Sequence, residues 1–168
     1  MTLRIEPLGK AHDRTTFSCG DAALDEWFRK RAGQDERRNV ARVFVAVDGG
    51  AVAGFYSLGA FTLALADMPE AVSAKLPRYD AIPAALIGRL ARNLTHRGCG
   101  IGELLLADAI RRVVGVSQEL AVFAIVVDAK NVAAADFYRS FGFIAFPQVP
   151  GRLFMLVSTA AAGLAKSA

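Results

Sequence analysis

Three glycines in one short stretch, Gly98, Gly100 and Gly102, constrain the fold of this chain more than any other feature. The stretch follows an apolar run over residues 83–94 and precedes apolar residues at helical spacing (Gly102, Leu105, Leu106, Ala109, Ile110 and Val113). We therefore predict a central strand that turns through a glycine loop into an amphipathic helix. In such a turn the unpaired N–H groups and the positive end of the helix dipole favour a bound anion.

The glycine loop does not fit the two commonest phosphate-binding patterns. No Gly-Lys-Ser/Thr follows it, as a Walker loop requires, and its Gly-x-Gly-x-Gly spacing lacks the last interval of the dinucleotide fingerprint. Taken alone, the loop is also consistent with a tight turn between a strand and a helix that binds nothing.

The composition predicts one folded domain over residues 1–168, with residues 163–168 as a flexible tail. The chain is 54% apolar, which is too apolar for a disordered protein and enough to build a core. No apolar run reaches the ~18 residues of a membrane span, and Arg4 and Glu6 break the stretch that a signal peptide would need. We therefore expect a cytoplasmic protein in which Cys19 and Cys99 are free thiols.

Basic residues are concentrated in two stretches of the chain. Its 20 Lys and Arg against 16 Asp and Glu give a net charge of +4. Residues 29–42 and residues 83–115 together carry more than this excess. Two explanations are open: a solvated surface, or a surface that binds a polyanion such as a nucleotide cofactor or RNA.

The order of the expected elements indicates a mixed α/β fold. Strands are expected over residues 3–7, 43–47, 51–58, 83–94, 121–127, 143–146 and 152–157, and the second and third of these form a hairpin. Helices are expected after a cap at Asp21, from Gly102 on and over residues 131–140. Residues 62–80, which contain two prolines, are expected to form a loop with one short helix.

Two segments resemble the GNAT acetyltransferase superfamily. Residues 97–102 match its Arg/Gln-x-x-Gly-x-Gly/Ala signature, and residues 128–143 are similar to its Asn-x-x-Ala-x-x-Phe-Tyr…Gly-Phe segment. The resemblance implies acetyl-CoA as cosubstrate and the GNAT fold. In that fold a mixed sheet of about six to seven strands is flanked by helices and splayed at the acetyl-CoA site.

A narrower resemblance is to the GNAT toxins of bacterial toxin–antitoxin pairs. It rests on the Phe-x-Cys-Gly-x-x-x-Leu-Asp-x-Phe/Trp pattern, which residues 17–27 match, on residues 54–58 and on residues 82–91. It implies transfer of an acetyl group to the α-amine of aminoacyl-tRNA, which blocks translation, and a small ribbon-helix-helix antitoxin as partner. We also expect a homodimer. Arg92 and Asn93 depart from the pattern of these toxins, which bears on amino-acid or tRNA preference but not on cofactor binding.

The resemblance also assigns residues to roles. The pyrophosphate of acetyl-CoA would be bound by the glycine loop (Arg97, Gly98, Cys99, Gly100, Ile101 and Gly102). Its pantetheine arm would lie along the end of the central strand and against the second motif (Leu90, Ala91, Arg92, Asn93, Asn131, Phe137 and Tyr138). A backbone N–H near Ala91 would stabilise the oxyanion. Basic side chains would contact tRNA phosphates (Arg29, Lys30, Arg31, Arg89 and Arg92).

Tyr138 is the candidate general acid. A phenol with a pKa of about 10 can protonate a departing thiolate whose thiol has a pKa of about 8.5. The other interpretation of Tyr138 is a core tyrosine packed beside Phe137 and Phe141. Neither His12 nor His96 lies in a constellation that indicates a general base. An α-amine needs no strong base, because its pKa of about 8 leaves it partly neutral at cellular pH.

The sequence offers no metal site and leaves two alternative functions open. No His, Cys or Asp cluster has the spacing of a zinc site, so no metal is expected. Two alternatives to the toxin hypothesis remain: a GNAT enzyme that acetylates a protein N-terminus or a small-molecule amine, and a binding module without turnover. An intact glycine loop together with Tyr138 argues against the binding module, since a pure binder needs no proton donor.

Overall fold

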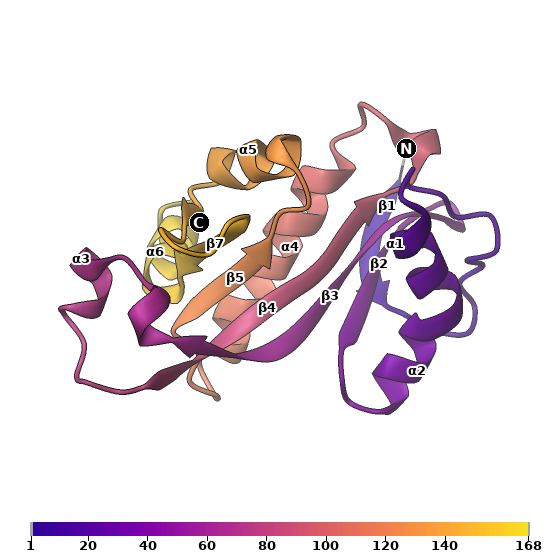
Figure 1. The fold of residues 1–168 in the computed structure, drawn as a ribbon. Helices are drawn as coiled ribbons and strands as arrows, with labels where there is room; N and C mark the ends of the chain where they lie inside the picture. Colours follow the sequence, from indigo (N-terminus) through magenta and orange to yellow (C-terminus); the bar gives the residue numbers. More distant parts are fainter. Residues whose placement is uncertain (1, 168) are drawn as a thin grey trace. The chain divides into compact units, whose positions relative to one another are not determined.

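The structure is a computed structural model that describes residues 2–167. Its strands form one sheet in the order β1-β2-β3-β4-β5-β7-β6, with the bounds β1 Leu3–Pro7, β2 Arg42–Asp48, β3 Ala51–Ala64, β4 Ala81–Arg92, β5 Ala124–Asp128, β6 Ile144–Ala145 and β7 Arg152–Leu156. The pairs β1–β2, β2–β3, β5–β7 and β6–β7 are antiparallel. The arrows of β4 and β5 point the same way (Figure 1), so the sheet is mixed, as predicted.

The described chain divides into two compact units. The first contains the chain up to Gly59 and Ile87–Ala109, and the second contains Ala60–Leu86 and the chain from Ile110 on. Strands β3 and β4 and helix α4 (Ile101–Val116) contribute residues to both units. That the two units form a single domain stays a prediction. No helix within residues 2–167 is long and apolar enough to cross a membrane.

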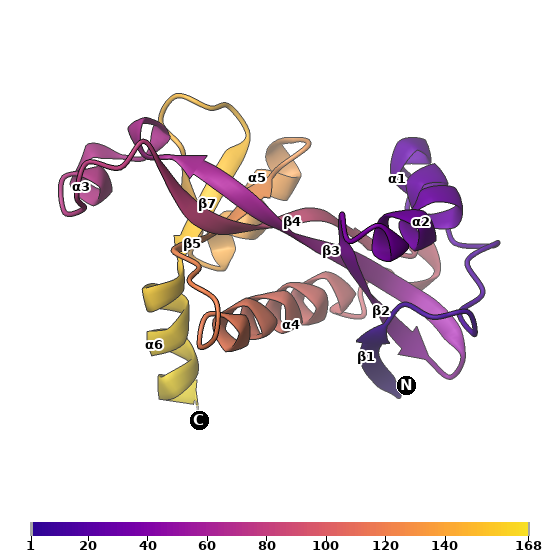
Figure 2. The same ribbon diagram turned by 90° about the horizontal axis from the view of Figure 1, so that it is seen from below.

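In the first unit a helical segment packs on one face of the strands, as Figure 2 shows for α1 (Ala22–Glu26) and α2 (Ala32–Arg37). Asp21 caps α1 as predicted, because its Oδ1 accepts hydrogen bonds from the N–H groups of Ala23 and Leu24 at 3.0 and 3.2 Å. The core beneath the segment is aromatic: the rings of Phe28 and Phe55 stack with centroids 4.1 Å apart, and Phe17 packs edge-on against both.

The middle of this helical segment differs from the expected α-helix. Residues Trp27–Arg31 form a π-helical turn, η1, in which the N–H of Ala32 donates to the carbonyl of Trp27. A π turn holds one residue more than an α turn. The extra residue brings Ala32, which is fully buried, onto the same side as Trp27 and Phe28.

The second unit contains the remaining elements. The segment over residues 62–80 is the predicted loop in part: β3 runs on to Ala64 and is followed by the 3-10 turn η2 (Leu65–Asp67) and helix α3 (Glu70–Ser73). Helix α5 (Val132–Ser140) begins after Asn131, as predicted. Helix α6 (Val157–Ser167) includes most of the residues that we expected to be a tail, and Ala168 lies outside the described residues.

Candidate functional site

The glycine loop lies in the first unit and leads into α4. Gly98 and Gly100 have φ of +74° and +73°, a left-handed conformation that favours glycine. A side chain at Gly98 would meet no heavy atom within 4 Å, and at Gly100 only the Glu103 carboxylate at 3.8 Å. The loop therefore presents an open backbone at the beginning of a 16-residue helix, where unpaired N–H groups attract an anion. This arrangement fits a pyrophosphate.

Gly54 on β3 is a site residue that the sequence analysis did not single out. A Cβ there would lie 2.8 Å from the carbonyl oxygen of Ala91 and 2.9 Å from side-chain atoms of both Ile101 and Leu105. Only glycine therefore lets β3 approach both the end of β4 and the beginning of α4. An isolated glycine inside a strand pattern is a known signal of such close approach, and it was available in the sequence.

The end of β4 carries the residues expected beside the pantetheine arm. Ala91 is buried in the aromatic core, and Leu90 is half-buried. The N–H of Asn93 donates to the carbonyl of Ala53 at 2.8 Å, and its Nδ2 donates to the carbonyl of Val52 at 3.1 Å, so this side chain fastens β4 to β3. Within residues 2–167, Nε of Arg92 is the one buried side-chain polar atom without a hydrogen-bond partner. A ligand acceptor would satisfy it.

Tyr138 lies in the second unit on α5. Its side chain is buried between Phe137 and Phe143, whose rings lie 5.4 and 5.8 Å from its own. Among the described residues its hydroxyl has no hydrogen-bond partner, yet it is not counted among the buried unpaired atoms, so the hydroxyl reaches the surface. Burial, followed by the negative charge of Asp128, raises the pKa of Tyr138 to about 12. Tyr138 is therefore protonated at neutral pH and free to donate.

Asn131 and Phe137, the two other predicted site residues of the second motif, lie at the beginning of α5 and within it. Oδ1 of Asn131 accepts a hydrogen bond from the N–H of Ala134 at 2.8 Å, so Asn131 is the N-cap of α5. Phe137 contacts Tyr138 and Phe141. A groove of about 330 Å³ lies beside α5, and its lining includes Asn131, Val132 and Arg139.

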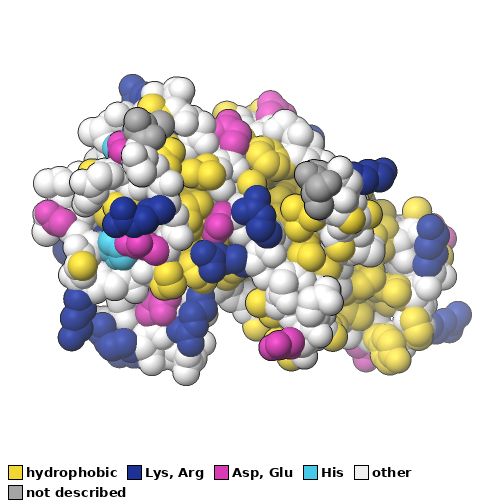
Figure 3. Space-filling view, turned by 180° about the vertical axis from the view of Figure 1, so that it is seen from behind, with side chains coloured by type: hydrophobic (Ala, Val, Ile, Leu, Met, Phe, Trp, Pro, Cys, Tyr) yellow, Lys and Arg dark blue, Asp and Glu magenta, His cyan; other side chains and the backbone are white. Residues whose placement is uncertain are grey.

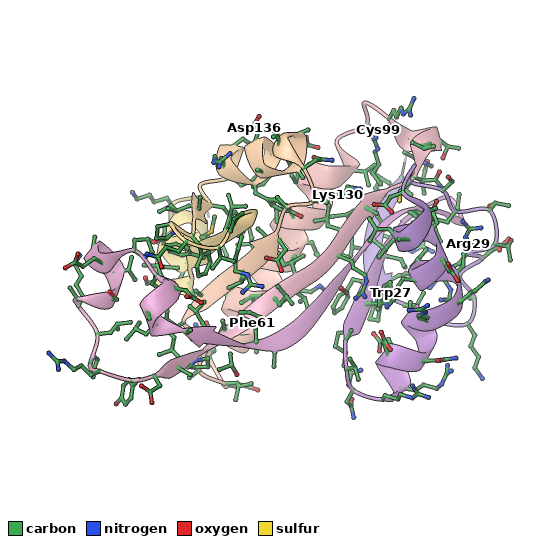
Figure 4. All side chains as sticks on the ribbon, in the orientation of Figure 1. Trp27, Arg29, Phe61, Cys99, Lys130 and Asp136 are labelled. Atoms are coloured by element: carbon green, nitrogen blue, oxygen red, sulfur yellow. The ribbon has the colours of Figure 1, made fainter. Side chains whose placement is uncertain are left out.

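The basic residues of the first unit fall into two groups. Arg29 and Lys30 form ion pairs with acidic residues one turn back, Asp25 at 3.7 Å and Glu26 at 3.8 Å. Arg31 is exposed, and within residues 2–167 it has no ion pair. Figure 4 shows Arg29 on the outer side of the helical segment and Trp27 on the side toward the strands.

Arg89, like Arg31 and unlike Arg29, has no ion pair within residues 2–167. Its guanidinium carbon lies 3.9 Å from the centroid of the Trp27 ring. Burial lowers the pKa of Arg89, while the nearby carboxylate of Asp35 raises it and the charge of Arg31 lowers it further. The structure thus brings Arg31 and Arg89 close enough to repel each other.

Both histidines are held by acidic partners. Nε2 of His12 lies 2.6 Å from Oε1 of Glu6, and Nε2 of His96 lies 3.0 Å from Oδ2 of Asp48. Figure 3, coloured by side-chain type, shows histidine atoms next to acidic side chains on the face that it presents. No group of three or more His, Cys, Asp or Glu in the described part of the chain could hold a metal ion.

The predicted site residues are therefore divided between the units. The loop, the end of β4 and the basic residues lie in the first unit, and Asn131, Phe137 and Tyr138 lie in the second. Each set is internally consistent with its expected role. That the two sets act on one bound molecule stays a prediction.

In both sequence and fold, the chain is similar to known acetyltransferases of the GNAT type. Residues 39–145 match the acetyltransferase (GNAT) domain family. The tRNA-acetylating toxin of Mycobacterium tuberculosis is 37% identical over 155 residues, which cover 92% of each protein. AtaT in complex with acetyl-methionyl-tRNAfMet has a TM-score of 0.90 and 27% identity, covering 97% of this chain and 99% of that one. A mutant AtaT toxin bound to the C-terminus of the antitoxin AtaR and to acetyl-CoA has a TM-score of 0.82 and 25% identity, covering 98% and 99%.

Proposed function

Because the chain belongs to the GNAT acetyltransferase family, we propose that it is a toxin that acetylates the α-amine of aminoacyl-tRNA with acetyl-CoA and so blocks translation. The observation that carries the proposal is the 37% identity to a tRNA-acetylating toxin over 92% of both chains. The solved toxin AtaT, which has the same fold, was captured with an acetylated aminoacyl-tRNA. A substrate of this kind is consistent with action in the cytoplasm.

Acetyl-CoA supplies an activated thioester, and the protein binds and orients it. The open N–H groups at the beginning of α4, together with Arg97, bind the pyrophosphate through the helix dipole and through charge. The end of β4 (Leu90, Ala91, Arg92 and Asn93) would lie along the pantetheine arm, and a backbone N–H near Ala91 would donate to the developing oxyanion. The unpartnered Nε of Arg92 and the open glycine loop support this assignment.

Tyr138 holds the proton that the departing thiolate takes. Its pKa of about 12 keeps that proton on Oη at every physiological pH. The hydroxyl has no protein partner that would compete for the proton within residues 2–167. The acceptor α-amine, with a pKa of about 8, loses its own proton to water, so the chemistry needs no strong base.

The acceptor RNA would lie on the basic side chains of the first unit. Arg31 and Arg89 have no ion pair of their own among the described residues, so both are available to phosphates. Lys30 is held only by an exposed pair with Glu26, which is weak, whereas Arg29 pairs with the buried carboxylate of Asp25. Arg29, Lys30 and Arg92 complete the proposed set of phosphate contacts. These contacts make binding salt-dependent, because each releases condensed counterions.

The partners follow from the same comparison. An AtaT toxin was solved with the C-terminus of its antitoxin, and we propose an antitoxin for this chain too, of the small ribbon-helix-helix type. We also propose that the toxin is a homodimer. Co-expression with a neighbouring gene product, followed by light scattering, would test both statements.

The chemistry is tested with Tyr138→Phe, which keeps the ring and deletes the hydroxyl. Turnover on charged tRNA should fall by ~10²- to 10⁴-fold, the usual contribution of general acid catalysis, with unchanged acetyl-CoA affinity. Tyr79→Phe is the matched control, because Tyr79 is exposed and has no assigned role. Induced wild type should arrest growth and Tyr138→Phe should not. Equal turnover of wild type and Tyr138→Phe would remove Tyr138 from the mechanism.

A further inference from the structure

Arg89 is a half-buried cation whose support is an aromatic ring. Its guanidinium carbon lies 3.9 Å from the centroid of the Trp27 ring, and Trp27 is itself 5% exposed. A guanidinium over an indole face is attracted by the ring quadrupole, and indole is the strongest of the aromatic partners. Trp27 therefore fixes the position of Arg89 without using any of its N–H donors.

The donors of Arg89 are unused. Within residues 2–167 no hydrogen bond or ion pair involves its side chain. Arg31, a cation that acts on it, is also without an ion pair within residues 2–167, and the two charges repel. A half-buried guanidinium with five free donors beside a second cation is a site that an anionic oxygen would stabilise.

One acidic side chain lies close enough to act on Arg89 but does not pair with it. Asp35 on α2 acts electrostatically on Arg89, yet no contact within ion-pair distance joins them. Its Oδ2 instead accepts a hydrogen bond from Nε1 of Trp27 at 2.9 Å. The indole N–H thus holds the Asp35 carboxylate, which would otherwise form an ion pair with the guanidinium of Arg89.

The π turn η1 makes this arrangement possible. Trp27 and Asp35 are eight residues apart, which would separate their directions by about 80° on a regular α-helix. One extra residue in the turn leaves about two full turns between them, so both side chains lie on the same side. The same turn ends at Arg31, the second unpaired cation.

We propose that Trp27 and Asp35 are positioning residues that hold Arg89 open for a backbone phosphate of the acceptor tRNA. The ring of Trp27 supports the guanidinium, and its N–H keeps the Asp35 carboxylate from pairing with Arg89. The inference rests on the proposed function, because it takes tRNA as the polyanion. It adds residues that contact no substrate themselves, and it gives the indole N–H of Trp27 a role that a phenyl ring could not fill.

The test is a double-mutant cycle on tRNA binding, measured by fluorescence anisotropy of labelled tRNA over a series of salt concentrations. In Trp27→Phe the ring remains but the N–H is lost, so Asp35 is released to pair with Arg89. Affinity should fall by about 10-fold, as for the loss of one charged hydrogen bond. The slope of log K against log salt should become shallower by about 0.7 to 0.9, the loss of one phosphate contact.

The second mutation separates positioning from packing. Asp35→Asn keeps an oxygen for the indole N–H and removes the charge, so it should bind tRNA no more weakly than wild type. Trp27→Phe/Asp35→Asn should recover the affinity of Asp35→Asn, since no carboxylate remains to block Arg89. Loss of core packing in Trp27→Phe would not be rescued by a change at Asp35. Arg4→Ala, on an exposed ion pair with Glu6, is the control for loss of one positive charge.

The outcomes distinguish the inference from the proposed function. Wild-type affinity and salt slope in Trp27→Phe, or a double variant as weak as Trp27→Phe, would overturn the positioning role. Absence of tRNA binding by the wild type would overturn it as well. Failure of the wild type to acetylate charged tRNA, while the binding cycle behaves as expected, would refute the proposed function and leave an RNA-binding site in place.

Discussion

Gly54→Ala is the substitution whose effect follows most directly from the structure. The added methyl group would lie 2.8 Å from the carbonyl oxygen of Ala91 and 2.9 Å from Ile101 and Leu105. None of the three can yield cheaply, because one is backbone and the other two side chains are fully buried. Overpacking of this kind costs about 1 to 3 kcal/mol of the free energy of unfolding. Because the methyl group pushes on the ends of β4 and α4, we also expect acetyl-CoA affinity to fall by about 10-fold.

The matched control is Gly59→Ala on the same strand. Its added methyl group would meet only the carbonyl of Val40, at 3.4 Å, which is an ordinary contact. Both substitutions lower the entropy of the unfolded chain equally, so that contribution cancels when the two variants are compared. Their difference in urea unfolding should therefore be about 1 to 3 kcal/mol, which corresponds to about 2 to 4 °C per kcal/mol in thermal unfolding.

Two measurements decide whether this reasoning holds. Chemical denaturation gives the free energy of unfolding, and calorimetric titration with acetyl-CoA gives the affinity. If Gly54→Ala were as stable as Gly59→Ala and bound acetyl-CoA like the wild type, the close approach of β3, β4 and α4 would not support the loop.

Two further predictions concern the loop and the acid. Gly100→Asp places a side chain and a negative charge in the open loop at a φ of +73°, so acetyl-CoA affinity, measured by calorimetry, should fall at least ~10-fold. The control Gly115→Asp in α4 should leave the affinity unchanged. Equal affinities of the two variants would exclude the loop from the site. As pH increases, kcat/KM should rise through the pKa of the acceptor amine, about 8. It should then stay level to pH 10, because the pKa of Tyr138 is raised to about 12 and the phenol keeps its proton. A decrease of kcat/KM with an apparent pKa below 10 would contradict the role of Tyr138.

Much of the fold could be predicted because local chemistry and long-range packing agree. The hairpin of β2 and β3 follows from Gly49 and Gly50, and the caps at Asp21 and Asn131 lie where the helices begin. The π turn could not be predicted, because residues 27–32 have an apolar spacing that an α-helix also permits. Only packing of Trp27 and Ala32 into the same core selects it.

The motifs of the site could be predicted from the sequence, but the residues that position Arg89 could not. The glycine loop and the segment around Tyr138 are each recognisable from a short stretch of sequence. The support of Arg89 by Trp27, and the restraint of Asp35, join residues from η1, α2 and β4 that no local pattern connects. A local signal does separate Arg31 from Arg29 and Lys30: acidic residues stand four positions before Arg29 and Lys30, and Trp27 stands four positions before Arg31, which has no ion pair among the described residues.

The acceptor in the proposed reaction is the α-amine of aminoacyl-tRNA. The most direct measurement incubates the purified protein with acetyl-CoA and total charged tRNA, and then identifies the aminoacyl ends by mass spectrometry. We predict aminoacyl ends that carry one acetyl group on the α-nitrogen with the wild type, and far fewer with Tyr138→Phe. Unmodified aminoacyl ends, from a wild-type protein that binds acetyl-CoA and acetylates a peptide N-terminus or a small amine, would contradict the account.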